Sequence, residues 1–310
     1  MNNKSRHCLS QKWLYPTFMA MSLIVTVAVL LGYRQSAASN PPLQMKNSDR
    51  EIETEPLPIP SPPNTPPTPP KNPPVTTPTP KPKEEQLVFA PPPQLRGTTF
   101  YQATLDNKIK AIALTFDDGP SPYTLKILEI LQRQKIKATF FCLGANLRTY
   151  PEIAKQVVKE GHAIGNHTWH HFYRNVDIAT AAAEIDNTAV HIYRATGAKS
   201  FLFRPPGGRL KNGLADYAKK KNYVIVMWSI DTKDFLMPPA TTIVDDVLSK
   251  ARSGAVVLMH DGGGNRDRTV QALPEIINGL KQKGFKFVTI PELLAMQQNK
   301  KQETAGSKSQ

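Results

Sequence analysis

Two separate stretches of the chain carry the side chains that metal-assisted hydrolysis requires. Asp117 and Asp118 end an apolar run that begins at Ala111, and His167 and His171 follow fifty residues later. One carboxylate and two imidazoles form a ligand set for a divalent metal that leaves coordination positions open. The other carboxylate remains free to act as a base. The types and spacing of these residues therefore predict metal-dependent hydrolysis.

Each stretch also has a plainer interpretation. The sequence Asp-Asp-Gly-Pro after a strand is typical of a turn, because Asp and Gly suit loop conformations and Pro stops the strand. Two histidines four residues apart share a face if their segment is helical, and a cluster of histidines also arises by chance. His170 competes with His171 as a ligand, although the four-residue spacing from His167 favours His171. Neither stretch decides the function by itself.

Three further motifs change the interpretation. They are Arg204-Pro-Pro-Gly-Gly208, Trp228-Ser-Ile-Asp-Thr-Lys-Asp-Phe235 and Val256-Val-Leu-Met-His-Asp261. With the first two stretches they make five motifs in a fixed order, and four of the five follow apolar, strand-like runs. On these motifs the chain resembles the polysaccharide deacetylases of carbohydrate esterase family 4, which share the NodB homology domain. The resemblance covers residues 98–298.

The resemblance implies a metal site. Asp118, His167 and His171 would bind a divalent ion and leave positions for water and for the substrate carbonyl oxygen. Zn²⁺ is the ion expected first, with Co²⁺, Mn²⁺, Ni²⁺ and Fe²⁺ as alternatives, because one carboxylate and two imidazoles suit several divalent ions.

The resemblance also implies the catalytic groups around that metal. Asp117 would take a proton from the attacking water, and His260 would protonate the departing amine. The backbone N–H of Gly207 would help the metal to stabilise the oxyanion. Arg204 would orient Asp117, and Asp231 would pair with His260 and raise its pKa.

Three substrate-binding positions complete the comparison with the family. Leu258 would line the pocket for the acetyl methyl group. Phe235 stands where the family often has tryptophan, which keeps an apolar wall but loses the indole N–H. Gly207 stands where the family commonly has an aromatic residue, so the groove wall is expected to be more open there.

The hydrophobic pattern predicts an α/β fold. Seven apolar runs predict strands, and amphipathic stretches between several of them predict helices, so the strands should form parallel βαβ units. The predicted strands are 111–116, 138–143, 162–166, 201–203, 223–230, 255–259 and 285–290. The predicted helices are 123–134, 151–160, 178–194, 241–251 and 269–283. About seven such strands favour a closed or nearly closed barrel, and the resemblance implies a distorted, incomplete (β/α) barrel with its site at the carboxyl ends of the strands.

The amino-terminal part predicts export. Residues 13–33 contain no charged side chain, while residues 1–12 contain Lys4, Arg6 and Lys12. An apolar stretch of about 20 residues crosses a bilayer, and basic flanks stay in the cytoplasm. We therefore expect a transmembrane anchor, with a cleavable signal segment as the alternative because small residues follow at 36–38. In either case the catalytic domain is expected outside the cytoplasm, in the periplasm or the cell wall, and secreted if the segment is cleaved.

A proline-rich segment connects this apolar stretch to the catalytic domain. Nineteen of the 29 prolines lie between Pro41 and Pro93. Such a sequence lacks the apolar side chains and backbone donors of a packed core and favours extended polyproline conformation. Residues 34–97 are therefore predicted to be a disordered linker, and residues 299–310 a polar tail.

The net charge of the predicted catalytic domain indicates which partners it can attract. Residues 96–310 contain 30 basic and 19 acidic side chains, a net charge of +11. A basic exported domain is attracted to anionic surfaces such as wall polymers, whereas export and the absence of a nucleic-acid-binding motif argue against nucleic acid as a partner. No protein partner can be inferred.

The two cysteines are not expected to form a disulfide. Cys8 and Cys142 would lie on opposite sides of the membrane.

Four functions remain open from the sequence. The leading one is a metal-dependent hydrolase that removes N-acetyl groups from N-acetylglucosamine residues of an extracellular polysaccharide, with peptidoglycan as the expected polymer. The second is an O-acetyl esterase acting on xylan or a similar polymer. The third is a catalytically silent glycan-binding wall protein, and the fourth a metal-dependent hydrolase of another bond.

Overall fold

The computed structural model describes residues 86–297. The predicted anchor at 13–33, most of the predicted linker at 34–97 and the predicted tail at 299–310 lie outside the described residues. Within residues 86–297, none of the helices combines the length and the apolar character needed to cross a membrane.

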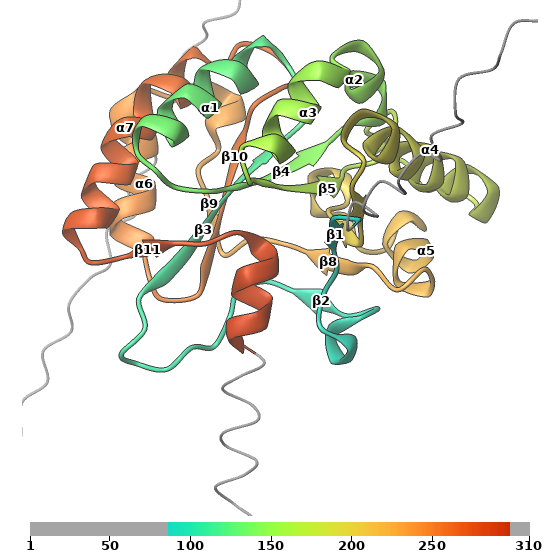
Figure 1. The fold of residues 1–310 in the computed structure, drawn as a ribbon, viewed down its shortest axis with the longest axis horizontal. Coiled ribbons are helices and arrows are strands. Elements are labelled where there is room, and N and C mark those ends of the chain that lie inside the picture. Colours follow the sequence, from blue (N-terminus) through green and yellow to red (C-terminus); the bar gives the residue numbers. More distant parts are fainter. Residues whose placement is uncertain (1–85, 298–310) are drawn as a thin grey trace, which may run out of the picture. The chain divides into compact units, whose positions relative to one another are not determined.

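A curled parallel sheet forms the centre of the described region (Figure 1). Its strands are β2 (Thr99–Phe100), β3 (Ala111–Asp117), β4 (Thr139–Cys142), β5 (Ala163–Asn166), β7 (Leu202–Phe203), β8 (Val224–Val226), β9 (Ile230–Asp231), β10 (Ala255–His260) and β11 (Lys286–Phe287). They are ordered β2-β8-β7-β5-β4-β3-β10-β9, with β11 paired to the beginning of β3. Within the described residues the end strands β2 and β9 do not pair with each other, so the barrel is incomplete, as predicted.

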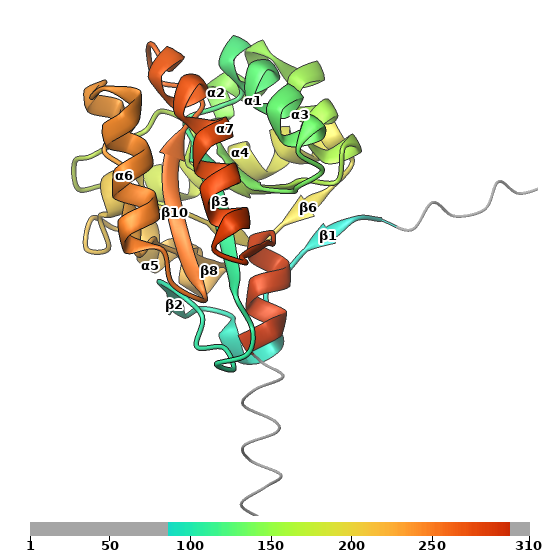
Figure 2. The ribbon, with the colours of Figure 1, turned by 90° about the vertical axis from the view of Figure 1, so that its left-hand side faces the viewer.

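Helices surround the outer face of this sheet (Figures 1 and 2). They are α1 (Pro122–Arg133), α2 (Gly144–Thr149), α3 (Pro151–Lys159), α4 (Ile178–Thr196), α5 (Leu214–Lys220), α6 (Ala240–Lys250) and α7 (Asp267–Gln282). The start of α1 shows how the sequence sets a boundary. Ser121 caps the helix in a reciprocal arrangement with Thr124, and Pro122 occupies the first turn, where no backbone donor is required.

Alternation along β3 separates two apolar layers. Ile112, Leu114 and Phe116 belong to the cluster that packs against the outer helices. Ala111 and Ala113 belong to a second cluster inside the barrel. Because successive side chains of a strand point to opposite faces, Thr115 and Asp117 continue the inner row. Asp117 therefore points into the barrel for the same reason that Ala111 does.

The inner cluster closes the barrel at the amino ends of the strands. A last helix begins at residue 290 and is described to residue 297. Its buried side chains Ile290, Leu293 and Leu294 pack in the same cluster as Ala111 and Phe100. Apolar side chains thus fill this end, and the polar residues of the inner row are left at the opposite, carboxyl end.

Most of the predicted strands are present, with one division. The predicted strand 223–230 consists of β8 and β9 with an irregular segment between them. This break lets the chain pass from β8, which lies next to the end strand β2, to β9 at the other end of the sheet. The short helices α2 and α5 were not predicted. Each spans fewer than eight residues, too few to produce a clear amphipathic pattern.

The end of the predicted linker was placed too late in the chain. Residues 86–97 belong to the folded region: β1 (Val88–Phe89) pairs in parallel with β6 (Lys199–Ser200), and a 3-10 turn, η1 (Pro93–Leu95), follows. Leu95 is buried, and Phe89 packs against the core. The apolar residues between the last prolines are sufficient to attach this segment to the domain.

Candidate functional site

The residues with chemical side chains gather where the parallel strands end. Asp117 ends β3 and lies opposite His260, the last residue of β10. Asp231 ends β9 and lies opposite Leu258 of β10. Parallel strands present their carboxyl ends at the same edge of the sheet, so the predicted convergence of the motifs is present.

Asp118, His167 and His171 form a compact group beside this edge. Asp118 Oδ1 lies 3.5 Å from His167 Nε2 and 3.3 Å from His171 Nε2. One ligand atom from each of the three side chains can be chosen so that all lie within 4.8 Å of one another. Asp118 Oδ1 is buried and has no hydrogen-bond partner among residues 86–297. A buried carboxylate oxygen that faces two imidazole nitrogens fits a divalent cation, which would satisfy all three.

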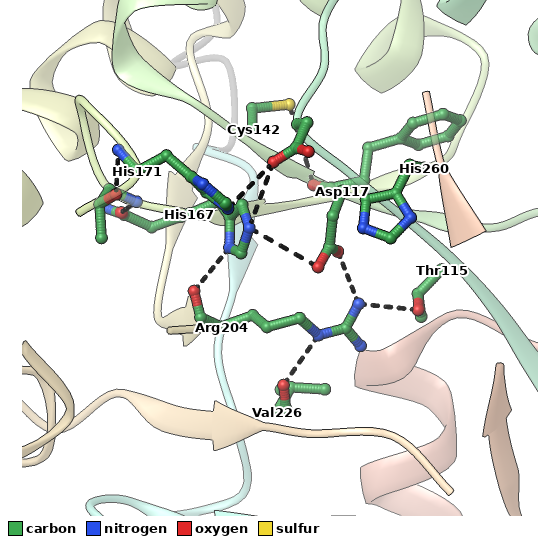
Figure 3. A network of polar contacts seen from close by, with 12 residues as sticks. Thr115, Asp117, Cys142, His167, His171, Arg204, Val226 and His260 are labelled. Carbon is green, nitrogen blue, oxygen red and sulfur yellow. Dashed lines mark hydrogen bonds and ion pairs between the residues drawn. The ribbon is translucent and has the colours of Figure 1, made fainter. Parts of the chain in front are cut away.

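The surroundings of His167 fix it in the form that binds a metal. Its Nδ1 lies 2.7 Å from the carbonyl oxygen of Arg204 (Figure 3), so Nδ1 carries the proton and donates it. Its Nε2 keeps a free lone pair and lies 3.5 Å from Asp118 Oδ1. Burial lowers the pKa of His167 to about 3, so this imidazole is neutral at physiological pH.

A loop, rather than a helix, brings the two histidines together. Thr168 and His171 have positive φ angles of 72° and 62°, and the His167 and His171 rings lie 5.0 Å apart. Glu184 of α4 holds this loop, because its Oε2 accepts hydrogen bonds from the backbone N–H groups of Trp169 and His170. The two histidines with the four-residue spacing thus both face Asp118, but a loop brings them together and not the face of a helix.

His170 is engaged away from the metal group. Its Nδ1 lies 2.6 Å from Glu184 Oε1, and its ring stacks on Phe172. Of the two histidines that competed in the sequence, His171 joins Asp118 and His167, whereas His170 fastens the loop to α4.

Arg204 makes the contact with Asp117 that the sequence predicted. Its Nη1 lies 2.6 Å from Asp117 Oδ1 and donates a second hydrogen bond to Thr115 (Figure 3). Its Nε donates to the carbonyl oxygen of Val226, and its guanidinium lies over the Phe141 ring. Burial raises the pKa of Asp117, and the charge of Arg204 opposes this rise. Arg204 is thus a buried cation that orients the carboxylate and balances its charge.

The partner of His260 is Asp234, and the prediction of Asp231 for this role was wrong. His260 Nδ1 lies 2.7 Å from Asp234 Oδ1, and the backbone N–H of His260 donates to Asp234 Oδ2. After β9 the chain turns through Lys233, with φ of 51°, into the short helix η3 (Asp234–Leu236). This turn carries Asp234 beneath the end of β10, while Asp231 stays at the cavity and accepts a hydrogen bond from the backbone of Lys233.

Asp234 also determines the charge of His260. Burial by itself lowers the pKa of His260, but the hydrogen bond and the charge of Asp234 outweigh it, and this pKa is raised. The pKa of Asp234 is correspondingly lowered, because His260 and Thr269 donate hydrogen bonds to the carboxylate against the effect of burial. The pair favours a protonated imidazole that is ready to give up a proton.

The gathered residues line one cavity of about 640 Å³. Its lining consists of Asp117, Asp118, Leu143, His167, His171, Tyr173, Gly207, Trp228, Asp231, Phe235, Leu258, His260, Gly263 and Arg266. All ten residues predicted for the site are among them except Arg204, which lies behind Asp117. This volume lies in the range of cavities that bind small molecules.

The more open wall expected at Gly207 is not present. A Cβ atom at position 207 would lie 2.7 Å from Cε1 of Tyr173, so the tyrosine ring already occupies the space beside the glycine. Tyr173 comes from the loop after His171, and no feature of the sequence indicates that it reaches this point.

Arg266 and Asp261 are further residues of the site that were not among the ten predicted ones. Arg266 lines the cavity and donates hydrogen bonds to the carbonyl oxygens of Gly262 and Gly263, so the glycine-rich loop after His260 is held rather than free. Asp261 lies behind the cavity and accepts a hydrogen bond from Thr124, and burial raises its pKa to about 7. Asp261 stands in the motif with His260, and that proximity was its only signal in the sequence.

Comparison with known proteins identifies relatives of this arrangement. The family model described as polysaccharide deacetylase matches residues 104–226. A peptidoglycan-N-acetylglucosamine deacetylase of Bacillus cereus is 40% identical over 207 residues, which cover 65% of this chain and 96% of that protein. The crystal structure of the peptidoglycan N-acetylglucosamine deacetylase Bc1960 is similar with a TM-score of 0.60 and 36% identity, covering 64% of this chain and 94% of that one. BA3943 of Bacillus anthracis, a pseudoenzyme of family CE4, is similar with a TM-score of 0.58 and 30% identity over 63% of this chain and 68% of that one.

Proposed function

Because the chain belongs to the polysaccharide deacetylases of carbohydrate esterase family 4, enzymes that hydrolyse amide bonds, we propose that it removes N-acetyl groups from N-acetylglucosamine residues of peptidoglycan, with a divalent metal as cofactor. The peptidoglycan-N-acetylglucosamine deacetylase from Bacillus cereus, 40% identical to this chain, supports that substrate. The observation that carries the proposal is the division of roles around one cavity. Asp118 faces two histidines, Asp117 is paired with Arg204, and His260 is paired with Asp234.

The metal would be held by Asp118, His167 and His171. When bound, it supplies a Lewis acid that polarises the acetyl carbonyl and lowers the pKa of a water molecule. Zn²⁺ is the ion that we propose, since a carboxylate and two imidazoles suit it. Nε2 of His167 lies 3.5 Å from Asp118 Oδ1 and is free to bind, because its Nδ1 proton is donated to the carbonyl oxygen of Arg204.

Asp117 acts as the base in the proposed reaction. Arg204 holds Asp117 Oδ1 at 2.6 Å, which leaves Oδ2 available to take a proton from the water that attacks the acetyl carbon. The backbone N–H of Gly207 donates to the oxygen that gains negative charge, and Leu258 contacts the acetyl methyl group. Both residues line the cavity that contains Asp117.

His260 acts as the acid in the second half of the reaction. An amide nitrogen is a poor leaving group until it is protonated. As the C–N bond breaks, its electron pair goes to nitrogen, and the proton from His260 Nε2 converts this nitrogen to a free amine. Acetate is the other product. The contact of 2.7 Å between Nδ1 and Asp234 directs Nε2 toward the cavity and stabilises the protonated ring before the transfer.

The proposed site of action is outside the cytoplasm. The uncharged residues 13–33, preceded by basic residues, support an anchor or an export segment. The proline-rich sequence that follows supports a spacer that lets the catalytic domain reach glycan strands. The net charge of +11 on residues 96–310 supports attraction to anionic wall polymers.

The proposal is tested by acetate release. The full chain, kept in mild detergent because of its apolar segment, is incubated with N-acetylglucosamine oligomers, purified peptidoglycan or acetylated xylan, with Zn²⁺ or with chelator. Metal-dependent release from the first two substrates is expected, and Asp117→Asn should abolish most of it. Release from acetylated xylan alone would identify an O-acetyl esterase. Glycan binding without release, in protein that contains metal, would identify a silent relative comparable to BA3943.

A further inference from the structure

Tyr173 lies at the cavity without a role in the reaction described above. The residue is 52% exposed, and its ring packs edge-to-face against the His171 ring, with the centroids 4.9 Å apart. The ring also lies against Gly207, where a Cβ atom would approach it to 2.7 Å. The ring therefore occupies the side of Gly207 on which a Cβ atom would lie and extends the wall of the cavity beyond the proposed metal ligands.

A second exposed aromatic side chain borders the cavity on the side of His260. Phe235 is 47% exposed, and its ring centroid lies 5.6 Å from that of His260 at an interplanar angle of 70°. Tyr173 and Phe235 thus each make an edge-to-face contact with a histidine of the site, and each residue is about half exposed. The cavity has an aromatic border beside the metal ligands and another beside the acid.

The chemistry of a pyranose explains such a pair of borders. A sugar ring presents hydroxyl groups around its rim and C–H groups on its faces, so it binds well where polar groups surround the reacting atoms and aromatic rings cover its faces. An accessible aromatic ring supplies a rigid apolar surface at little cost in conformational entropy. A single exposed tyrosine is ordinary on a protein surface, but this one is held in place by His171 and Gly207.

We propose that Tyr173 is a substrate-binding residue whose ring forms the wall, on the side of His171 and Gly207, against which the N-acetylglucosamine ring packs. Phe235 forms the wall near His260, and the acetyl group enters between them toward Asp117. This inference rests on the proposed function for the identity of the sugar, but the role of Tyr173 in binding is measured separately from catalysis.

The position of Tyr173 depends on the absence of a side chain at Gly207. Position 207 has φ of 57°, a conformation that favours glycine, and any Cβ atom there would displace the tyrosine ring. The loop after His171 contributes Tyr173, and the turn after β7 contributes position 207. A side chain from only one of these two positions can occupy the space between them. In this chain Tyr173 fills it, and substitutions at the two positions should not act independently.

The test measures binding of the N-acetylglucosamine tetramer by calorimetry, using the full chain with Asp117→Asn so that no substrate is consumed. Tyr173→Ala should weaken binding roughly 3- to 10-fold, the loss expected for one aromatic contact. Tyr173→Phe keeps the ring and should retain the affinity. Tyr193→Ala is the matched control, because Tyr193 is an exposed tyrosine on α4 that does not line the cavity. Metal content, measured by mass spectrometry, should be the same in all four proteins.

Three results would overturn the role of Tyr173. The first is unchanged affinity in Tyr173→Ala, and the second is an equal loss in Tyr173→Phe, which would assign the effect to the hydroxyl group. The third is a loss of metal together with affinity, which would show that Tyr173 only supports His171. Gly207→Ala should weaken binding in protein that retains Tyr173, and it should weaken binding less in protein that already carries Tyr173→Ala. Equal effects in the two proteins would refute the claim that a side chain at position 207 and the Tyr173 ring compete for the same space.

The outcomes also separate this inference from the proposed function. If the unsubstituted chain releases no acetate but binds the tetramer through Tyr173, the proposed deacetylation is refuted and the binding role of Tyr173 is supported. If the chain releases acetate and Tyr173→Ala changes neither the affinity nor KM, the proposed deacetylation is supported and the binding role of Tyr173 is refuted.

Discussion

Replacing Asp234 with asparagine tests the proposed acid and separates it from the alternative that the sequence favoured. Asp234 accepts hydrogen bonds from Nδ1 of His260 at 2.7 Å, from the backbone N–H of His260 at 2.9 Å and from Thr269 Oγ1 at 2.6 Å. Asparagine has nearly the same shape and retains an acceptor, but it removes the negative charge from a fully buried position. The protonated form of His260 then loses its stabilising partner while the effect of burial remains.

The expected result is a slower reaction and a displaced pH profile. A positioned general acid contributes about 10²- to 10⁴-fold to a rate, equivalent to about 2.7–5.5 kcal/mol of activation free energy, and kcat at neutral pH should fall within that range. His260 acts only when protonated, so activity is lost as pH rises through its pKa. Because the substitution lowers this pKa, the alkaline limb of the profile should move to lower pH.

The assay is acetate release from the N-acetylglucosamine tetramer as a function of pH, with metal content and thermal unfolding measured on the same protein. Asp231→Asn serves as the matched variant, since Asp231 borders the same cavity but bonds to the backbone of Lys233. Its alkaline limb should coincide with that of the unsubstituted chain. A displaced limb in Asp231→Asn with an unchanged limb in Asp234→Asn would refute the assignment.

Three further substitutions test the metal group, its supporting loop and the base. Asp118→Asn should abolish stoichiometric metal binding because it removes the only carboxylate of the metal group, and full metal content by mass spectrometry would contradict the ligand assignment. Glu184→Gln should weaken metal affinity about 10- to 100-fold, since groups that orient ligands have effects of that size, and an unchanged dissociation constant in chelator competition would refute its positioning role. Arg204→Ala leaves the buried carboxylate of Asp117 unpaired, so urea unfolding should show about 3–5 kcal/mol lower stability. In the same variant the pKa of Asp117 rises further, and because the base acts when deprotonated, the acid limb of the pH profile should move to higher pH.

The sequence predicts the fold well where the strands are long and buried. β3 is buried at all seven positions, and its continuous apolar run is the pattern of a parallel strand covered on both faces. The unpredicted strands β1, β2 and β6 contain two residues each, too few for a recognisable period. The same limit explains why the folded region begins before the predicted boundary at residue 98.

The sequence predicts the site where a residue directly ends a strand. Asp117 and His260 end paired strands, so their juxtaposition follows from parallel topology alone. Asp234 and Tyr173 are placed by loops, and their contacts depend on backbone turns at Lys233 and at His171 that the residue types do not specify. The motif 228–235 contains two aspartates, and only the turn between them determines which one reaches His260.

The different surroundings of Asp117 and Asp118 account for the division of labour between two adjacent, chemically identical residues. Asp117 lies on the inner row of β3 with Thr115, where the buried guanidinium of Arg204 already balances its charge. Asp118 has φ of 73°, which turns its carboxylate out of the strand toward His167 and His171 and leaves Oδ1 without a hydrogen bond among the described residues. A buried anionic oxygen without a partner is unfavourable unless a cation binds it, whereas a paired carboxylate can exchange a proton without creating an isolated charge. The positive φ at Asp118 thus separates the ligand from the base, and a substitution that returned residue 118 to an extended conformation should abolish metal binding while leaving the contact between Arg204 and Asp117 intact.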